Sequence, residues 1–187
     1  MMHERAGPEA GEGREPEVAI HVCPMTRVEE TVAASGATRL VTLLASGTVF
    51  ERPAAIAPAN HLSLWMNDIV EAQAGLVAPG RAHVERLLAF AQEWDRAQPL
   101  VINCFAGISR STAAAYIVAA ALAPARDEMD MARALRRLSP SATPNPGLVR
   151  HADALLRREG RMVAAIAAIG RGADAFEGTP FVLPLGG

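Results

Sequence analysis

Short apolar runs alternate with segments of helical periodicity along the chain. Apolar runs of four to six residues predict strands, at residues 18–22, 39–44, 61–65 and 99–102. Apolar positions at helical spacing, bounded by Gly or Pro, predict helices at about 26–36, 80–97, 109–123, 127–138 and 148–158, with a continuation of the last to 169 left open. This order predicts an α/β fold with a central, mostly parallel sheet, helices on both faces and a helical C-terminal half.

Local signals define several of these elements. The run at 99–102 is continuously apolar, as in a strand that is covered on both faces of a sheet. Thr26 and Glu29 have the spacing of a capping box at the start of the first helix, and Gly36 would end that helix.

The ends of the chain differ from its middle. Residues 1–17 are charged and rich in Gly, Pro and Glu, which predicts a flexible tail without the features of a signal peptide. Residues 18–170 form one predicted domain, a size that 187 residues accommodate readily. Residues 171–187 are predicted to be a C-terminal tail, or an arm against the body of the domain.

Charge and cysteine content narrow the function. A formal net charge of −2 favours neither nucleic acid nor an anionic membrane as a partner. The longest apolar run, residues 113–123, is too short to span a bilayer. The two cysteines, Cys23 and Cys104, are far apart and make no disulfide framework, so we expect a reducing, cytoplasmic location. The composition leaves the oligomeric state open.

The most informative stretch is INCFAGISRST, residues 102–112, which leaves the last predicted strand and enters a helix. A loop at such a junction can turn its backbone N–H groups inward as an anion cradle, and the helix N-terminus adds positive potential. Gly107 permits a tight turn there. Arg110 can hold two phosphate oxygens with its planar guanidinium group.

The same positive potential acts on Cys104 at the rim of the cradle. It favours the thiolate, which is the nucleophilic form of cysteine. Ser111 could donate a hydrogen bond to the sulfur and make it a better leaving group. These residues fit phosphoryl transfer to Cys104, followed by hydrolysis of the phosphocysteine, and the scheme requires no metal or other cofactor.

The pattern of Cys104, five residues, Arg110 and Ser111 resembles the signature loop of the cysteine-based protein tyrosine phosphatases. The arrangement of residues 18–158 looks most similar to the compact dual-specificity branch, outside the loop mainly in order and spacing. The resemblance implies that the loop between Cys104 and Ser111 binds phosphate through Phe105, Ala106, Gly107, Ile108, Ser109 and Arg110.

A phosphatase of this kind also needs an acid to protonate the departing oxygen. In the dual-specificity branch this acid is an Asp on a loop upstream of the cysteine, and the resemblance assigns the role to Asp68, 36 positions before Cys104. Glu71 is close enough to be a rival. Asp95 falls near the end of a predicted helix and fits less well.

Two asparagines are candidate supporting residues. Asn103 stands where the family usually has His, so it can supply hydrogen bonds to the loop but no titratable charge. Asn145, in the sequence TPNP, resembles a polar position of the family that packs beside the phosphate loop. Ordinary turn chemistry also explains an Asn at this position.

The expected substrate is a phosphorylated protein or a small phosphomonoester: phosphotyrosine, or phosphoserine and phosphothreonine as well. The loop residues between Cys104 and Arg110 include no basic side chain, which disfavours phosphoinositides. Two alternatives stay open, namely a phosphate-binding pseudophosphatase and a rhodanese-like sulfurtransferase. Cys23 is interpreted as a core residue, with reversible oxidative pairing to Cys104 as a further hypothesis.

Overall fold

One five-stranded sheet organises the structure, a computed structural model that describes residues 18–186. The strands are β1 (Ala19–Pro24), β2 (Arg39–Leu44), β3 (His61–Trp65), β4 (Leu100–Cys104) and β5 (Phe181–Pro184). Their order is β3-β2-β4-β1-β5, and every pair is parallel except β1 with β5. The mostly parallel sheet predicted from the apolar runs is confirmed.

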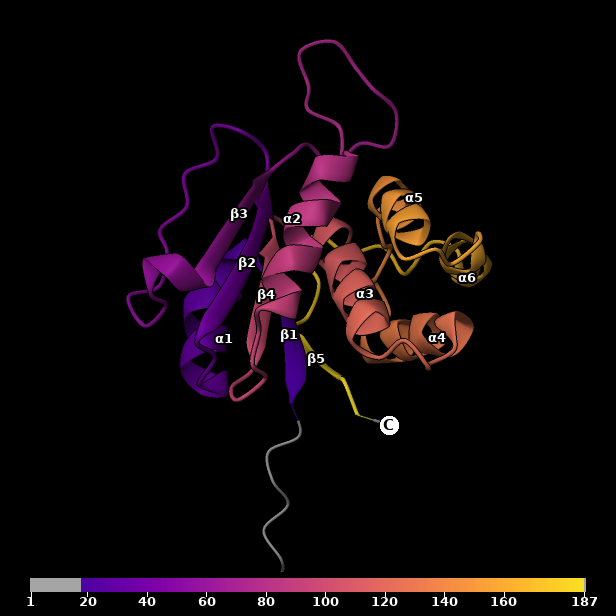
Figure 1. The fold of residues 1–187 in the computed structure, drawn as a ribbon. Coiled ribbons are helices and arrows are strands. Elements are labelled where there is room, and N and C mark those ends of the chain that lie inside the picture. Colours follow the sequence, from indigo (N-terminus) through magenta and orange to yellow (C-terminus); the bar gives the residue numbers. More distant parts are fainter. Residues whose placement is uncertain (1–17, 187) are drawn as a thin grey trace, which may run out of the picture.

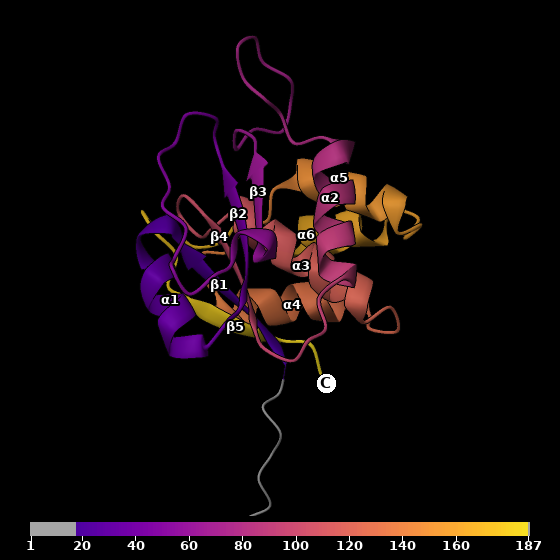
Figure 2. The ribbon, with the colours of Figure 1, turned by 60° about the vertical axis from the view of Figure 1, so that its left-hand side comes forward.

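Helices cover both faces of this sheet, as predicted (Figure 1). They are α1 (Val28–Ser35), α2 (Arg81–Gln92), α3 (Arg110–Leu122), α4 (Glu128–Leu138), α5 (Pro146–Leu155) and α6 (Arg161–Ile169). Figure 2 shows α1 on one side of the sheet and α2 to α6 on the other. Within residues 18–186, no helix combines the length and apolar character needed to cross a bilayer.

The alanine-rich helix α3 forms the centre of the larger helical layer. It contacts the sheet and the helices α2, α4 and α5, and its residues from Arg110 to Ala120 are all buried. Small side chains allow these neighbours to approach closely, which explains an all-round apolar helix in a globular protein. Because α3 is so firmly packed, its first turn is a rigid platform beside the end of β4.

Two helix predictions need correction. The helix predicted at 148–158 is α5, but its open continuation to 169 is a separate helix, α6, because Arg157, Glu159 and Gly160 adopt positive φ values between them. The Asp153 carboxylate accepts hydrogen bonds from the backbone N–H groups at Gly160 and Met162 and so fixes the break. The predicted capping box of Thr26 is also wrong, since its hydroxyl donates instead to the Glu177 carboxylate, at 3.0 Å.

The C-terminal stretch runs along the body of the protein. Residues 170–180, here called the C-terminal arm, connect α6 to β5, which pairs with the free edge of β1. Phe181 and Leu183 of β5 are buried in the main core. The tail predicted at residues 1–17 lies outside the described residues.

Candidate active site

The site is built at the C-terminal end of β4, the central strand of the sheet. Cys104 is the last residue of this strand, and β1 and β2 flank it on either side. Its side chain is buried among the residues that face α3. The Cys104 Sγ atom lies 3.1 Å from the Ser111 Oγ atom, in the first turn of α3. The strand and the helix therefore place a hydroxyl against the thiol.

The backbone between Cys104 and α3, here called the phosphate loop (residues 104–110), turns its carbonyl groups outward. Those of Phe105, Ala106, Ile108 and Ser109 accept hydrogen bonds from the backbone N–H groups of Met25, Gly178, Thr143 and Asn145, at 2.8–3.3 Å. None of the N–H groups of residues 105–109 donates to another residue in the described part of the chain. The N–H groups of the loop are therefore left free to bind an anion, as they are in an anion-binding nest.

Gly107 lets the loop take this shape. It adopts φ +70°, and a Cβ atom built on it would lie 2.6 Å from the backbone nitrogen of Pro24 and 2.9 Å from the carbonyl carbon of Cys23. A side chain at this position would therefore strain the backbone and collide with the end of β1. The structure requires the glycine that the sequence pattern contains.

Arg110 is the first residue of α3 and follows the loop directly. The residue is only 6% exposed, and its Nη1 donates to the Met66 carbonyl at 2.8 Å. Its buried Nε has no hydrogen-bond partner among residues 18–186 and lies 3.9 Å from Oδ2 of Asp68. A fixed, buried guanidinium group with an unused N–H beside an amide nest is well suited to bind an oxyanion.

Asp68 is brought to the loop from a distant part of the chain. Its Oδ1 accepts a hydrogen bond from the Ser109 hydroxyl at 2.7 Å and another from the Asn145 side-chain amide at 2.9 Å. The carboxylate is partly exposed, so it stands between the loop and solvent. The structure thus brings Asp68, Arg110 and Asn145 together, although they belong to three separate segments.

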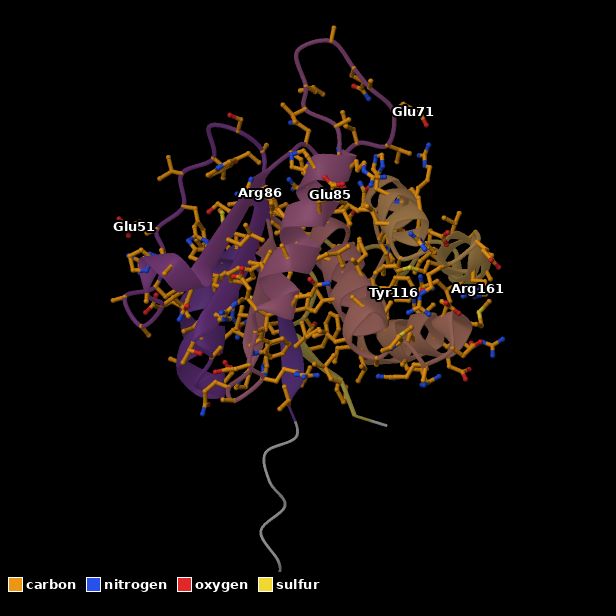
Figure 3. The ribbon with its side chains drawn as sticks, in the orientation of Figure 1. Glu51, Glu71, Glu85, Arg86, Tyr116 and Arg161 are labelled. Atoms are coloured by element: carbon orange, nitrogen blue, oxygen red, sulfur yellow. The ribbon has the colours of Figure 1, made fainter. Side chains whose placement is uncertain are left out.

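The two rival acids lie elsewhere. Glu71 is exposed on the connection between β3 and α2, which protrudes from the body (Figure 3). Asp95 follows α2 and accepts a hydrogen bond from the backbone N–H of Ala97, close to the start of β4. Asp95 therefore precedes the start of β4, whereas Cys104 lies at the other end of this strand.

Asn145 combines the two roles considered for it. Its Oδ1 accepts hydrogen bonds from the backbone N–H groups of Gly147 and Leu148 and so caps α5. Its Nδ2 meanwhile donates to Asp68 and to the Ile69 carbonyl. The turn chemistry therefore fixes the amide that orients the Asp68 carboxylate.

Asn103 points away from Cys104, because neighbouring residues of a strand face opposite sides of the sheet. Its Oδ1 accepts a hydrogen bond from the Thr42 hydroxyl at 2.8 Å, and this hydroxyl lies 2.9 Å from the His61 Nε2. The three side chains form a polar chain across β4, β2 and β3. Burial and the nearby Arg52 guanidinium lower the pKa of His61, which favours its neutral form.

Sequence reasoning missed this polar chain. Thr42 lies in an apolar run, where a β-branched threonine is common for reasons of strand propensity alone. His61 begins the strand predicted at 61–65, and its neighbours in the sequence indicate no partner for it. Its link to Asn103 depends on the register of three strands, which no local pattern reveals.

Cys23 lies on the other face of the sheet from Cys104. It is in register with Asn103, and its side chain belongs to the small core against α1. Both cysteines are free. Burial raises the pKa of the Cys23 thiol to about 11, so the thiol is protonated and unreactive near neutral pH. This geometry supports the interpretation of Cys23 as a core residue.

Comparison with known proteins identifies the fold. No protein-family model and no curated protein sequence matches the chain. Among solved structures, the Cydia pomonella PTP-2 phosphatase is similar with a TM-score of 0.57 and 16% identity, over 72% of this chain and 84% of that one. Human DUSP28 is similar with a TM-score of 0.52 and 20% identity, over 75% and 92% of the two chains.

DUSP15 is similar with a TM-score of 0.56 and 15% identity, over 86% of this chain and 97% of that one. At these identities the likeness concerns the fold. The chain has the fold of the protein tyrosine and dual-specificity phosphatases.

Proposed function

We propose that this protein is a cysteine-dependent phosphomonoesterase of the dual-specificity phosphatase type. One observation carries the proposal: the loop that joins the Cys104 thiol to the buried Arg110 guanidinium keeps its N–H groups at residues 105–109 free of partners among the described residues. The phosphatase fold supports it independently of these side chains. The proposed substrates are phosphotyrosine residues of cytoplasmic proteins, with phosphoserine and phosphothreonine as further candidates.

In the first step, the Cys104 thiolate attacks phosphorus while the bond from phosphorus to the leaving oxygen breaks. The N–H groups of the loop and Arg110 hold the remaining phosphoryl oxygens and stabilise the charge that develops on them. Asp68 donates its proton to the departing oxygen.

In the second step, water attacks phosphorus of the phosphocysteine. Asp68, now a carboxylate, accepts a proton from this water, and the sulfur–phosphorus bond breaks. The Ser111 hydroxyl, 3.1 Å from Sγ, donates a hydrogen bond to the departing thiolate. Ser109 and Asn145 hold the carboxylate in place through their hydrogen bonds to Oδ1.

A substrate panel in the presence of EDTA tests the proposal. We expect wild-type protein to hydrolyse p-nitrophenyl phosphate and phosphotyrosine peptides, and Cys104→Ser to lose this activity. Phosphopeptide binding without any turnover would instead indicate a pseudophosphatase. Transfer of sulfur from thiosulfate to cyanide would indicate a rhodanese-like sulfurtransferase. A Cys104→Ser variant with undiminished phosphatase activity would refute the role of this residue.

A further inference from the structure

An open cleft of about 520 Å³ adjoins the phosphate loop, outside the catalytic groups described above. One wall is formed by Ile108 and Ser109 of the loop, and the other by residues of the C-terminal arm that include Ala173, Ala175 and Phe176. Ser109 therefore faces the cleft and also holds Asp68 through its hydroxyl. Ser109 thus connects the cleft to the residue that we propose as the acid for the leaving group.

The arm is fixed on both sides of the cleft. On one side, the backbone N–H of Ala173 donates to the Pro140 carbonyl at 2.8 Å. On the other side, the N–H of Gly178 donates to the Ala106 carbonyl of the phosphate loop at 2.8 Å, and Glu177 accepts the hydrogen bond from Thr26. Residues 174–176 are thus held between two anchors.

Close backbone contact shows that this position of the arm is built into the fold. A Cβ atom on Gly178 would lie 2.8 Å from the Gly107 carbonyl oxygen, and one on Gly172 would lie 2.6 Å from the Pro140 carbonyl oxygen. The arm can approach the phosphate loop at Gly178, and Pro140 at Gly172, this closely because both positions are glycines. Movement of the arm away from the loop would break these contacts.

The anchored arm presents an aromatic side chain to solvent. Phe176 is 88% exposed although the backbone around it is held. The charged residues of the cleft, Arg171 and Asp174, pair with each other at 2.5 Å, which leaves the site without net charge. The walls contributed by Ile108, Ala173 and Phe176 therefore favour an uncharged, apolar occupant.

We propose that this cleft is a specificity subsite for the peptide chain of the substrate. It takes an apolar or aromatic side chain next to the phosphorylated residue, with Phe176 as the contact that closes over it. The proposal rests on the proposed function for the position of the phosphoryl group. A small phosphomonoester would fill the cradle alone, whereas a phosphopeptide extends beyond it, and the cleft that begins at Ser109 can receive a side chain next to the phosphorylated residue.

The test measures binding, so that it does not depend on turnover. In a Cys104→Ser background, fluorescence anisotropy gives the Kd of two phosphotyrosine peptides. One peptide has leucine at both positions next to the phosphorylated residue, and the other has glycine at both. We expect the leucine peptide to bind about tenfold more tightly, in keeping with partial burial of one such side chain. Phe176→Ala should remove this preference, and the control Val49→Ala, at an equally exposed position, should keep it.

Equal affinity of the two peptides for the Cys104→Ser protein would overturn the subsite. So would a preference that survives Phe176→Ala. Sedimentation of the full chain tests the other occupant of an exposed Phe176: a dimer that Phe176→Ala dissociates would show that a second copy of the chain covers it, and would also overturn the proposal. If the wild-type protein shows no turnover, the proposed function is contradicted. The binding preference is measured separately in the Cys104→Ser protein, so the two failures can be told apart.

Discussion

Gly107 is the residue of the phosphate loop at which the backbone leaves least room for a side chain. Gly107→Ala is therefore the single change that tests the shape of the loop most directly. The methyl group would meet two backbone atoms of β1, at 2.6 Å from the Pro24 nitrogen and 2.9 Å from the Cys23 carbonyl carbon. Both atoms belong to a strand held by β4 and β5, so they cannot move aside without disturbing the sheet. The residue also has φ +70°.

The expected loss of stability has two parts. A non-glycine residue in the left-handed region costs about 1–2 kcal/mol. Overpacking against a rigid backbone adds about 1–3 kcal/mol. Gly36→Ala is a matched control, because Gly36 has φ +68° and its Cβ would meet only the flexible Gln98 side chain, at 3.9 Å. The control variant should therefore lose only the stability that the left-handed backbone conformation costs, without the cost of overpacking.

Urea unfolding of both variants, with kcat/KM for p-nitrophenyl phosphate, checks this expectation. Gly107→Ala should unfold at least about 1 kcal/mol more easily than Gly36→Ala. It should also lose most of its activity, because relief of the collision turns the N–H groups of the loop out of the cradle. If the two variants match in both stability and kcat/KM, the account of the loop is wrong.

Three further predictions concern other parts of the site. Asp68→Ala should lower kcat for phosphopeptides by about 10²–10⁴-fold while inhibition by inorganic phosphate persists, and an unchanged kcat would assign the acid role to another residue. Thr42→Val should lower the free energy of unfolding by about 1–3 kcal/mol, because it leaves the buried Asn103 carbonyl oxygen without its hydrogen bond. The control Thr42→Ser should retain both stability and kcat. Equal stability of the two variants would contradict this prediction. Because the pKa of Cys23 is about 11 in the folded protein against an ordinary 9.0, the unfolded chain loses this proton first as pH rises. The stability of wild type should therefore fall between pH 9 and 11 relative to Cys23→Ala by about 2 kcal/mol, and parallel pH profiles in urea unfolding would show that the thiol does not contribute.

The parts of the fold that local sequence determines could be predicted. The four parallel strands are apolar runs long enough to be recognised in the sequence. Helix α3 ends shortly before a proline, and α4 ends at the loop that follows it, which is rich in Pro and Ser. Strand β5 could not be recognised, because its four residues become a strand only by pairing with the free edge of β1. The break between α5 and α6 likewise depends on the side chain of Asp153, seven residues before Gly160.

The same distinction applies to the site. Cys104, Gly107, Arg110 and Ser111 lie within eight consecutive residues, so one strand-to-helix junction was enough to group them. Asp68 could be named only through a family resemblance, since its approach to Ser109 depends on tertiary structure. The polar chain through Thr42 and the contact of the arm with the loop join segments that no sequence pattern connects.

A covalent intermediate is the most direct test of the central claim, that Cys104 takes up the phosphoryl group. Wild-type protein is mixed with p-nitrophenyl phosphate, quenched in acid during turnover, digested and analysed by mass spectrometry. We predict one added phosphoryl group on the peptide that contains Cys104, and none on that peptide from Cys104→Ser. Steady turnover by wild type with no phosphoryl group on Cys104 would contradict the account.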